Sequence, residues 1–233
     1  MKNISALIIL QLSVFCFVPN IQAQHSSTGN WFQYFGIHPT ASRWLVLTEA
    51  QHRNYNFAGD LQQFMVRAGA GYNLTPSNHN LMVGYAYILS ENYLPDSDTE
   101  KIRTFENRLF GQFAFKHPMG RVMLGHRYRA EYRQFGHQSE SWRARYQLWF
   151  QFPLNKSVIE SGTLYLMVSD EIFLNTTHPQ FDRNRLYGAF GYCISRYLSV
   201  ELGMMRQSLS TTARNQLQIA LFNRIPFKTR SQE

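Results

Sequence analysis

Few residues of this chain carry charge, and few could form a disulfide. Charged residues make up 16% of the 233 positions, whereas soluble domains average about 25%. Two cysteines are too few for a disulfide-rich scaffold. Eight prolines and 14 glycines exclude collagen-like and linker sequence. The mean hydropathy of −0.33 excludes a bundle of membrane helices, because each span needs about 20 mostly apolar residues.

Aromatic residues, by contrast, are abundant. The chain has 18 Phe, 13 Tyr and 4 Trp, which together are 15% of its residues. So many aromatics with so few charges exclude a disordered chain and indicate a folded one rich in strand-forming residues. The 23 basic residues, most of them arginine, outnumber the 15 acidic ones and give a net charge of +8.

The first 23 residues read as a secretory signal peptide. Lys2 provides the positive start, Ile4 to Val18 form the apolar stretch, and Ile21-Gln22-Ala23 is a cleavage site that ends in a small residue. A core helix or a membrane anchor is the alternative, which the shortness of the apolar stretch disfavours. Removal of the peptide would leave Cys193 as the only cysteine and a net charge of +7.

Alternation with a period of two dominates the rest of the chain. Between Arg121 and Gln134 one set of alternate positions is mostly apolar or aromatic, and the other carries four arginines and Glu131. Residues 141–152 repeat the pattern. A strand places alternate side chains on opposite faces, whereas a helix would scatter these arginines around its surface. Each segment therefore predicts a strand with one apolar and one polar face.

Ten segments with this pattern are long enough to cross a membrane as strands. Strands in soluble sheets usually have five or six residues, and a tilted strand that crosses a bilayer needs about nine to eleven. The segments are 44–55, 61–74, 80–91, 102–116, 121–135, 141–152, 163–174, 183–194, 199–208 and 215–227. They predict an all-β fold, an antiparallel up-and-down transmembrane β-barrel of ten strands. Twelve strands are the alternative, because bacterial barrels are even-numbered.

Residues 29–37 are a further strand-like piece, which we interpret as a partial strand, a plug or the sign of one more missed strand. The predicted organisation is a signal peptide (1–23), an N-terminal segment (24–43), a β-barrel domain (44–227) and a C-terminal tail (228–233). Short connections alternate with longer ones, apart from the long connection 153–162. This is a fair match to outer-membrane barrels, which have short periplasmic turns.

Alternation alone does not say which face lies inside, and a soluble periplasmic lipocalin-like barrel would place the apolar face inward. The outer membrane is favoured by the arginine-rich polar face, by the C-terminal Ile225-Pro-Phe227, and by aromatics near the segment ends. We therefore predict outer-membrane localisation, with membrane lipid and the barrel-insertion machinery as partners. The aromatics are Trp44, Tyr55, Phe64, Tyr72, Phe105, Phe115, Tyr132, Trp142, Phe152, Phe173, Tyr192 and Phe227.

Several short motifs together resemble one known family, the domain-of-unknown-function family 2490. The resemblance covers essentially the whole mature chain, from about residue 31 to residue 227. It implies secretion in Bacteroidota-type bacteria and an outer-membrane β-barrel, and it implies no activity. The motifs are Trp44 with Glu49-Ala-Gln-His-Arg53, Arg67-Ala-Gly-Ala-Gly-Tyr72 with Gly84-Tyr85, His126-Arg-Tyr-Arg-Ala-Glu131, Asp170-Glu-Ile-Phe-Leu-Asn175, and Phe181-Asp-Arg-Asn-Arg-Leu-Tyr-Gly188 with Gly191-Tyr192.

The charges on the polar face form the most concrete candidate site. Guanidinium groups pair well with carboxylates, and a ten-stranded barrel has little room beyond its own side chains. The predicted role is a structural network that fills the lumen, or the passage or binding of a small anionic solute. The arginines form no exposed patch, so nucleic acid is not a predicted partner. On this register the residues are Glu49, Arg53, Arg67, Glu106, Arg108, Arg127, Arg129, Glu131, Arg133, Arg143, Arg145, Glu171, Arg185 and Glu201, with Arg121 beside them.

A lipid acyl hydrolase of the outer membrane is the alternative function. His137 and Ser139 lie two residues apart, which places both on one face of an extended chain. Nothing nearby indicates an oxyanion hole, so a polar loop is favoured and no catalytic residue is assigned. His126 lies on the apolar face of its segment and is interpreted as a packing residue. The eight histidines are dispersed without metal-ligand spacing, so neither a metal nor a cofactor is predicted.

Overall fold

The computed structural model describes residues 28–75, 79–136 and 139–227, and within them the chain forms eleven β-strands and no helix. The predicted signal peptide and the predicted tail lie outside the described residues. In the described ranges no helix has the length and apolar character needed to span a membrane. The strands are β1 (Gly29–Pro39), β2 (Trp44–Asn54), β3 (Leu61–Asn73), β4 (His79–Tyr93), β5 (Lys101–Met119), β6 (Val122–Phe135), β7 (Ser139–Pro153), β8 (Leu164–Asn175), β9 (Phe181–Cys193), β10 (Leu198–Ser208) and β11 (Ala213–Asn223).

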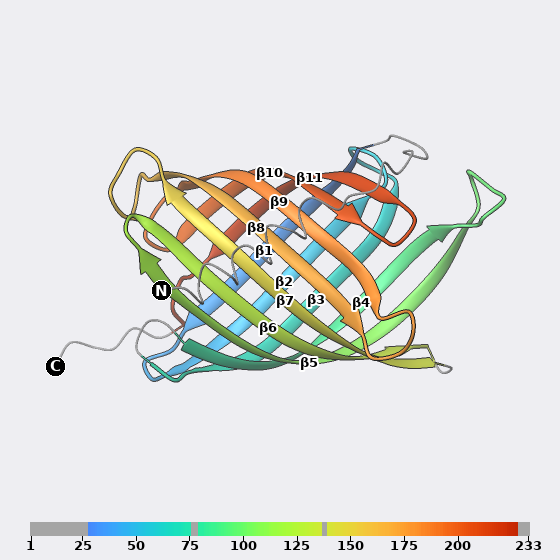
Figure 1. Ribbon diagram of the computed structural model, residues 1–233, viewed down its shortest axis with the longest axis horizontal. Helices are drawn as coiled ribbons and strands as arrows, with labels where there is room; N and C mark the ends of the chain where they lie inside the picture. The colour runs from blue at the N-terminus through green and yellow to red at the C-terminus, as the bar shows by residue number, and fades with distance from the viewer. Residues whose placement is uncertain (1–27, 76–78, 137–138, 228–233) are drawn as a thin grey trace, which may run out of the picture.

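The strands form one closed barrel and are strongly tilted (Figure 1). From β2 to β11 they pair antiparallel in chain order, and β1 lies between β2 and β11, antiparallel to β2 and parallel to β11. A barrel with an odd number of alternating strands must close in this way, because its first and last strands run in the same direction. The all-β barrel is therefore confirmed, while the predictions of ten strands, twelve strands and a fully antiparallel wall are wrong.

β1 is a full wall strand and neither a partial strand nor a plug. Residues 29–36 all have partners in β11. Inside the barrel, Gln33 donates a hydrogen bond to Gln218 at 2.8 Å, and the rings of Phe35 and Phe222 stack at 5.0 Å. The barrel consequently begins at Gly29 instead of at residue 44.

The other ten strands lie close to the ten predicted segments, and the clearest difference is at the C-terminal end. β11 ends at Asn223, short of the predicted end at Phe227. Pro226 has no amide hydrogen with which to continue a ladder. Phe227 instead stacks on the His38 ring at 4.4 Å.

The connections define two ends of the barrel. End A carries the β1–β2, β3–β4, β5–β6, β7–β8 and β9–β10 connections and the last residue of β11. End B carries the other five connections and the first residue of β1. The β4–β5 hairpin projects beyond the neighbouring strands at end B (Figure 1). The described chain therefore enters the barrel at end B and leaves it at end A.

The inner and outer faces of the wall differ in chemistry. Large apolar side chains are exposed on the outer face, for example Val83 at 65%, Phe190 at 62% and Leu202 at 56%. Buried apolar groups inside form only small clusters, such as Leu45 with Met82 and its neighbours. The buried charged residues are Glu49, Arg67, Glu106, Arg108, Arg129, Glu131, Arg143, Arg145, Glu171 and Glu201.

Disulfide formation across the closing pair tests the eleven-stranded barrel. Gln33 and Ala220 are direct partners in β1 and β11. Cysteines at both positions should oxidise to a disulfide, because directly paired residues have Cα atoms within disulfide range. The cross-linked chain should migrate differently from the reduced chain in a denaturing gel. Tyr34→Cys with Ala220→Cys, on opposite faces, is the control, and equal cross-linking of both pairs, or of neither, would contradict this closure.

Candidate functional site

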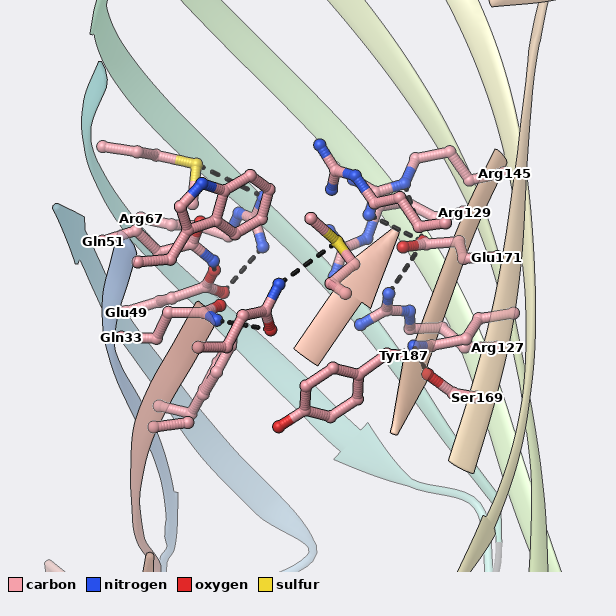
Figure 2. A pocket seen from close by; sticks show the side chains of 18 of the residues that line it. Gln33, Glu49, Gln51, Arg67, Arg127, Arg129, Arg145, Ser169, Glu171 and Tyr187 are labelled. Atoms are coloured by element: carbon pink, nitrogen blue, oxygen red, sulfur yellow. Dashed lines mark hydrogen bonds and ion pairs between the residues drawn. The ribbon is translucent and has the colours of Figure 1, made fainter. Parts of the chain in front are cut away.

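A cavity of about 430 Å³ lies inside the barrel, and all eleven strands contribute to its walls. Its volume is in the range of pockets that hold small ligands. Because alternate residues of every strand point inward, no short stretch of sequence builds this cavity. Figure 2 shows two polar groups facing each other across it, Glu49, Gln51 and Arg67 on one side and Arg127, Arg129, Arg145 and Glu171 on the other.

The structure gathers the predicted polar residues around this cavity. Glu131 has none of its surface exposed and lies beside the cavity wall. Arg121 does not join them, because β6 begins at Val122 and Arg121 is exposed in the preceding turn, where it donates to the carbonyl of Lys156. The predicted residues that line the cavity are Glu49, Arg53, Arg67, Glu106, Arg108, Arg127, Arg129, Arg133, Arg143, Arg145, Glu171, Arg185 and Glu201.

Glu131 is the centre of the ion-pair network. Arg143 donates Nε and Nη2 to its Oε2 at 2.9 and 2.6 Å, and Arg145 donates Nη1 to its Oε1 at 2.6 Å. Arg108 and Arg129 approach the same carboxylate at 3.6 and 3.8 Å. These residues meet because β6 pairs with both β5 and β7. One buried carboxylate thus compensates part of the charge of four guanidinium groups.

Glu171 extends the network across the next strand. It accepts from Arg145 at 2.7 Å and from Arg127 at 2.8 Å. Arg145 therefore connects Glu131 and Glu171, and through them β6, β7 and β8. Further pairs join Arg67 to Glu49, Arg108 and Arg133 to Glu106, and Arg143 and Arg183 to Asp182.

Positive charge is in excess inside the barrel. Eleven arginines line the cavity in the described part of the chain, against six carboxylates in or beside the same interior. Glu201 accepts from the hydroxyls of Tyr165 and Tyr187 at 3.0 and 3.1 Å and forms no ion pair with another described residue. The arginines are Arg53, Arg67, Arg108, Arg127, Arg129, Arg133, Arg143, Arg145, Arg183, Arg185 and Arg224, and the acids are Glu49, Glu106, Glu131, Glu171, Asp182 and Glu201.

All of these arginines except Arg224 lie in the middle of the cavity or toward end B, and the rest of the end A half is more apolar. Met82, Trp149 and Phe222 line it there. Gly125 lies against Trp149, and a Cβ at this glycine would overlap the indole ring. The interior is therefore narrowed by bulky apolar groups toward end A and lined by ion pairs elsewhere.

Phe173 was predicted for an interfacial girdle, and this prediction is wrong. The ring points inward with 1% of its surface exposed, and the guanidinium carbons of Arg145 and Arg185 lie 4.3 and 4.7 Å from its centroid. It shares a face of β8 with Glu171, so alternation alone was sufficient to place it inside.

Sequence reasoning missed several interior residues, among them Asp182, Arg183, Arg224 and Trp31. Asp182 and Arg183 belong to β9 and form an ion pair at 3.0 Å, although the sequence suggested a connection up to residue 182. Arg183 is two residues from Arg185, and this spacing in a strand predicts that both side chains lie on the same face. Trp31, buried in β1, had no such signal, because its segment had no assigned place in the wall.

The weaker candidates form no catalytic arrangement within the part of the chain that the structure describes. His137 lies outside the described residues, and Ser139 is exposed at the start of β7. His126 lies on the outer face, where its ring stacks on Phe115 at 4.5 Å and Nδ1 is 2.9 Å from the Tyr146 hydroxyl. Among the described residues no group of three or more potential metal ligands comes together.

Replacement of Glu131 by glutamine tests how far the fold depends on the network. Glu131→Gln keeps the side-chain shape and leaves four arginines without their shared negative charge, so we expect a loss of about 3–5 kcal/mol in unfolding free energy. Urea unfolding followed by tryptophan fluorescence measures this loss.

Glu91→Gln is the matched control. Glu91 pairs at 2.6 Å with Arg103, whose side chain is 62% exposed, and such pairs contribute about 0–1 kcal/mol. Equal losses in both variants would show that the buried network does not hold the barrel together.

Comparison with known proteins gives a family match. Residues 28–218 match the family described as "Protein of unknown function (DUF2490)". No curated protein and no solved structure matches the chain. The match covers most of the chain and nearly all of the barrel. The chain therefore belongs to the DUF2490 family.

Proposed function

We propose that this protein is an outer-membrane β-barrel that binds a small anionic solute in its lumen. The observation that carries this proposal is an inside-out distribution of polarity, with arginines around an internal cavity and apolar side chains exposed on the outer face. Water-soluble proteins bury apolar groups and rarely expose large contiguous apolar surfaces.

The outer face supports membrane insertion. The exposed side chains of β9 and β10 include Phe190 at 62%, Tyr192 at 46%, Leu202 at 56% and Met204 at 47%. In the barrel wall Phe190 and Leu202 are direct partners, so these groups form a continuous patch. A soluble lipocalin-like barrel would have the reverse arrangement, with the apolar face inward.

Aromatic pairs near the two ends support the same location. Trp44 and Tyr72 meet edge-to-face at 5.2 Å near end A, and Tyr132 and Trp142 meet at 5.2 Å near end B. An eleven-residue strand rises about 33 Å along its axis, which at a tilt near 40° spans about 25 Å of membrane. This is the height of the apolar band in transmembrane barrels.

The proposed orientation places end A in the periplasm. Most connections at end A are short, whereas the projecting β4–β5 hairpin lies at end B. Short turns face the periplasm in outer-membrane barrels. The C-terminal segment that ends in Phe227 would then be available on that side to the barrel-insertion machinery.

The lumen fits binding better than free passage. The cavity is small, ion-paired side chains line its middle, and Trp149 and Phe222 narrow it toward end A. Its arginine excess favours an anion, since rings of arginine bias a pore or pocket toward negative charge.

A charge introduced on the outer face tests membrane insertion. Leu202 lies in the middle of β10, and Leu202→Arg should cost about 2–4 kcal/mol of unfolding free energy in lipid vesicles, because the guanidinium would enter the hydrocarbon. Ile102→Arg is the control, since Ile102 is similarly exposed at 52% but lies on the projecting hairpin. A soluble barrel would tolerate both changes equally.

Planar-bilayer recording tests binding against passage. We expect no steady ion conductance from the wild-type protein, because bulky side chains narrow the lumen toward end A. Trp149→Ala combined with Phe222→Ala should open a small anion-favouring conductance, whereas Trp142→Ala, on the outer face, should not. Steady anion-selective conductance steps from the wild-type protein would contradict binding and would show that anions pass through the lumen.

A further inference from the structure

Two arginines at the end B side of the cavity are held by glutamine and not by a carboxylate. Arg53 donates Nε and Nη2 to Oε1 of Gln51 at 3.2 and 2.5 Å, and Arg185 donates Nε to Oε1 of Gln207 at 2.9 Å. Neither guanidinium has a carboxylate of another described residue within ion-pair distance. An amide oxygen orients a guanidinium without supplying a negative charge to compensate it.

The same two arginines meet over one aromatic ring. The guanidinium carbon of Arg53 lies 3.8 Å from the centroid of the Trp31 ring, and that of Arg185 lies 5.1 Å from it. Arg185 is also 4.7 Å from the Phe173 ring centroid. Aromatic faces attract cations, but they carry no net charge. Two positive charges are therefore held close together by neutral groups.

The nearest acids are already engaged. Glu49 accepts from Arg67 at 2.6 Å and from Gln51 at 2.6 Å. Glu171 accepts from both Arg127 and Arg145. Neither carboxylate is free to turn toward the glutamine-held arginines.

The free polar groups at this place are donors. The indole Nε1 of Trp31 is buried and has no acceptor in the described part of the chain. Nη1 of Arg53 and both terminal nitrogens of Arg185 have no hydrogen bond to a described side chain. A ligand that satisfies them must supply acceptor atoms and negative charge, and guanidinium forks match the oxygens of phosphate well.

We propose that Arg53, Arg185 and Trp31 form a subsite for a doubly charged oxyanion, such as the phosphate group of a small dissolved solute. This inference rests on the proposed function and names its ligand class. Two uncompensated cations match a dianion in charge. A dissolved solute is favoured over a lipid headgroup, because both arginines line the internal cavity and the wall separates them from the apolar outer face.

Titration of the purified barrel with inorganic phosphate tests the subsite. Maltoside micelles in phosphate-free buffer exclude phospholipid as the phosphate source, and calorimetry measures the dissociation constant. We expect saturable binding by the wild type. Arg53→Gln and Arg185→Gln should each weaken it about tenfold or more, the usual effect of losing one charge-assisted hydrogen bond.

Gln207→Glu is the sharper variant, because it keeps Arg185 in place and gives it an internal counter-ion. It should weaken phosphate binding about as much as Arg185→Gln. Arg103→Gln removes the same charge from the projecting hairpin, where the side chain is 62% exposed, and should leave binding unchanged.

The folded form is checked in the same samples by the gel mobility of unboiled protein. A folded, membrane-inserted wild type that binds no phosphate overturns the subsite and leaves the membrane barrel standing. The subsite is also overturned if Arg185→Gln and Gln207→Glu bind phosphate as tightly as the wild type. A wild type that partitions as a soluble protein removes the proposed function itself.

Discussion

The pairing of buried arginines with a smaller number of carboxylates is the constraint on which the rest of this structure depends. Charges withdrawn from water are costly unless they are paired and hydrogen-bonded. Glu131 and Glu171 meet this cost by sharing their oxygens among several guanidinium groups. Because the interior is polar, the apolar side chains of the same strands must face outward. The ion-pair network and the apolar exterior therefore both follow from the alternation of polar and apolar residues along the strands.

The closing strand contributes aromatic and amide side chains to the cavity. β1 lies parallel to β11 and brings Trp31, Gln33 and Phe35 to the cavity. Without Trp31, Arg53 and Arg185 would lack the shared ring over which they meet. The odd strand thus completes the wall and also contributes to the excess of hydrogen-bond donors at the end B side. The arginines that contact Glu131, in contrast, come from β5, β6 and β7.

Strand positions and the polar face were readable from the sequence because the period of two is local. A residue's face follows from its neighbours, so Arg127, Arg129 and Glu131 could be assigned together. The same logic failed where local order breaks. Arg121 precedes β6 by one residue and lies in a turn, and Asp182 lies beside the register shift between Phe173 and Leu174. For Phe173 the alternation along β8 predicts the buried inner face correctly, whereas its position near a segment end does not.

The sequence by itself determined the all-β class, most of the strands and which charges share a face. Each of these depends on the spacing of neighbouring residues along one strand. Only the tertiary structure decided the number of strands, the parallel closure and the partner of each arginine. Residues such as Gln33 and Gln218, or Arg185 and Trp31, are brought together by strand pairing across the whole chain. No periodic pattern in the sequence predicts such contacts, because they depend on how the wall closes and not on the sequence of any one strand.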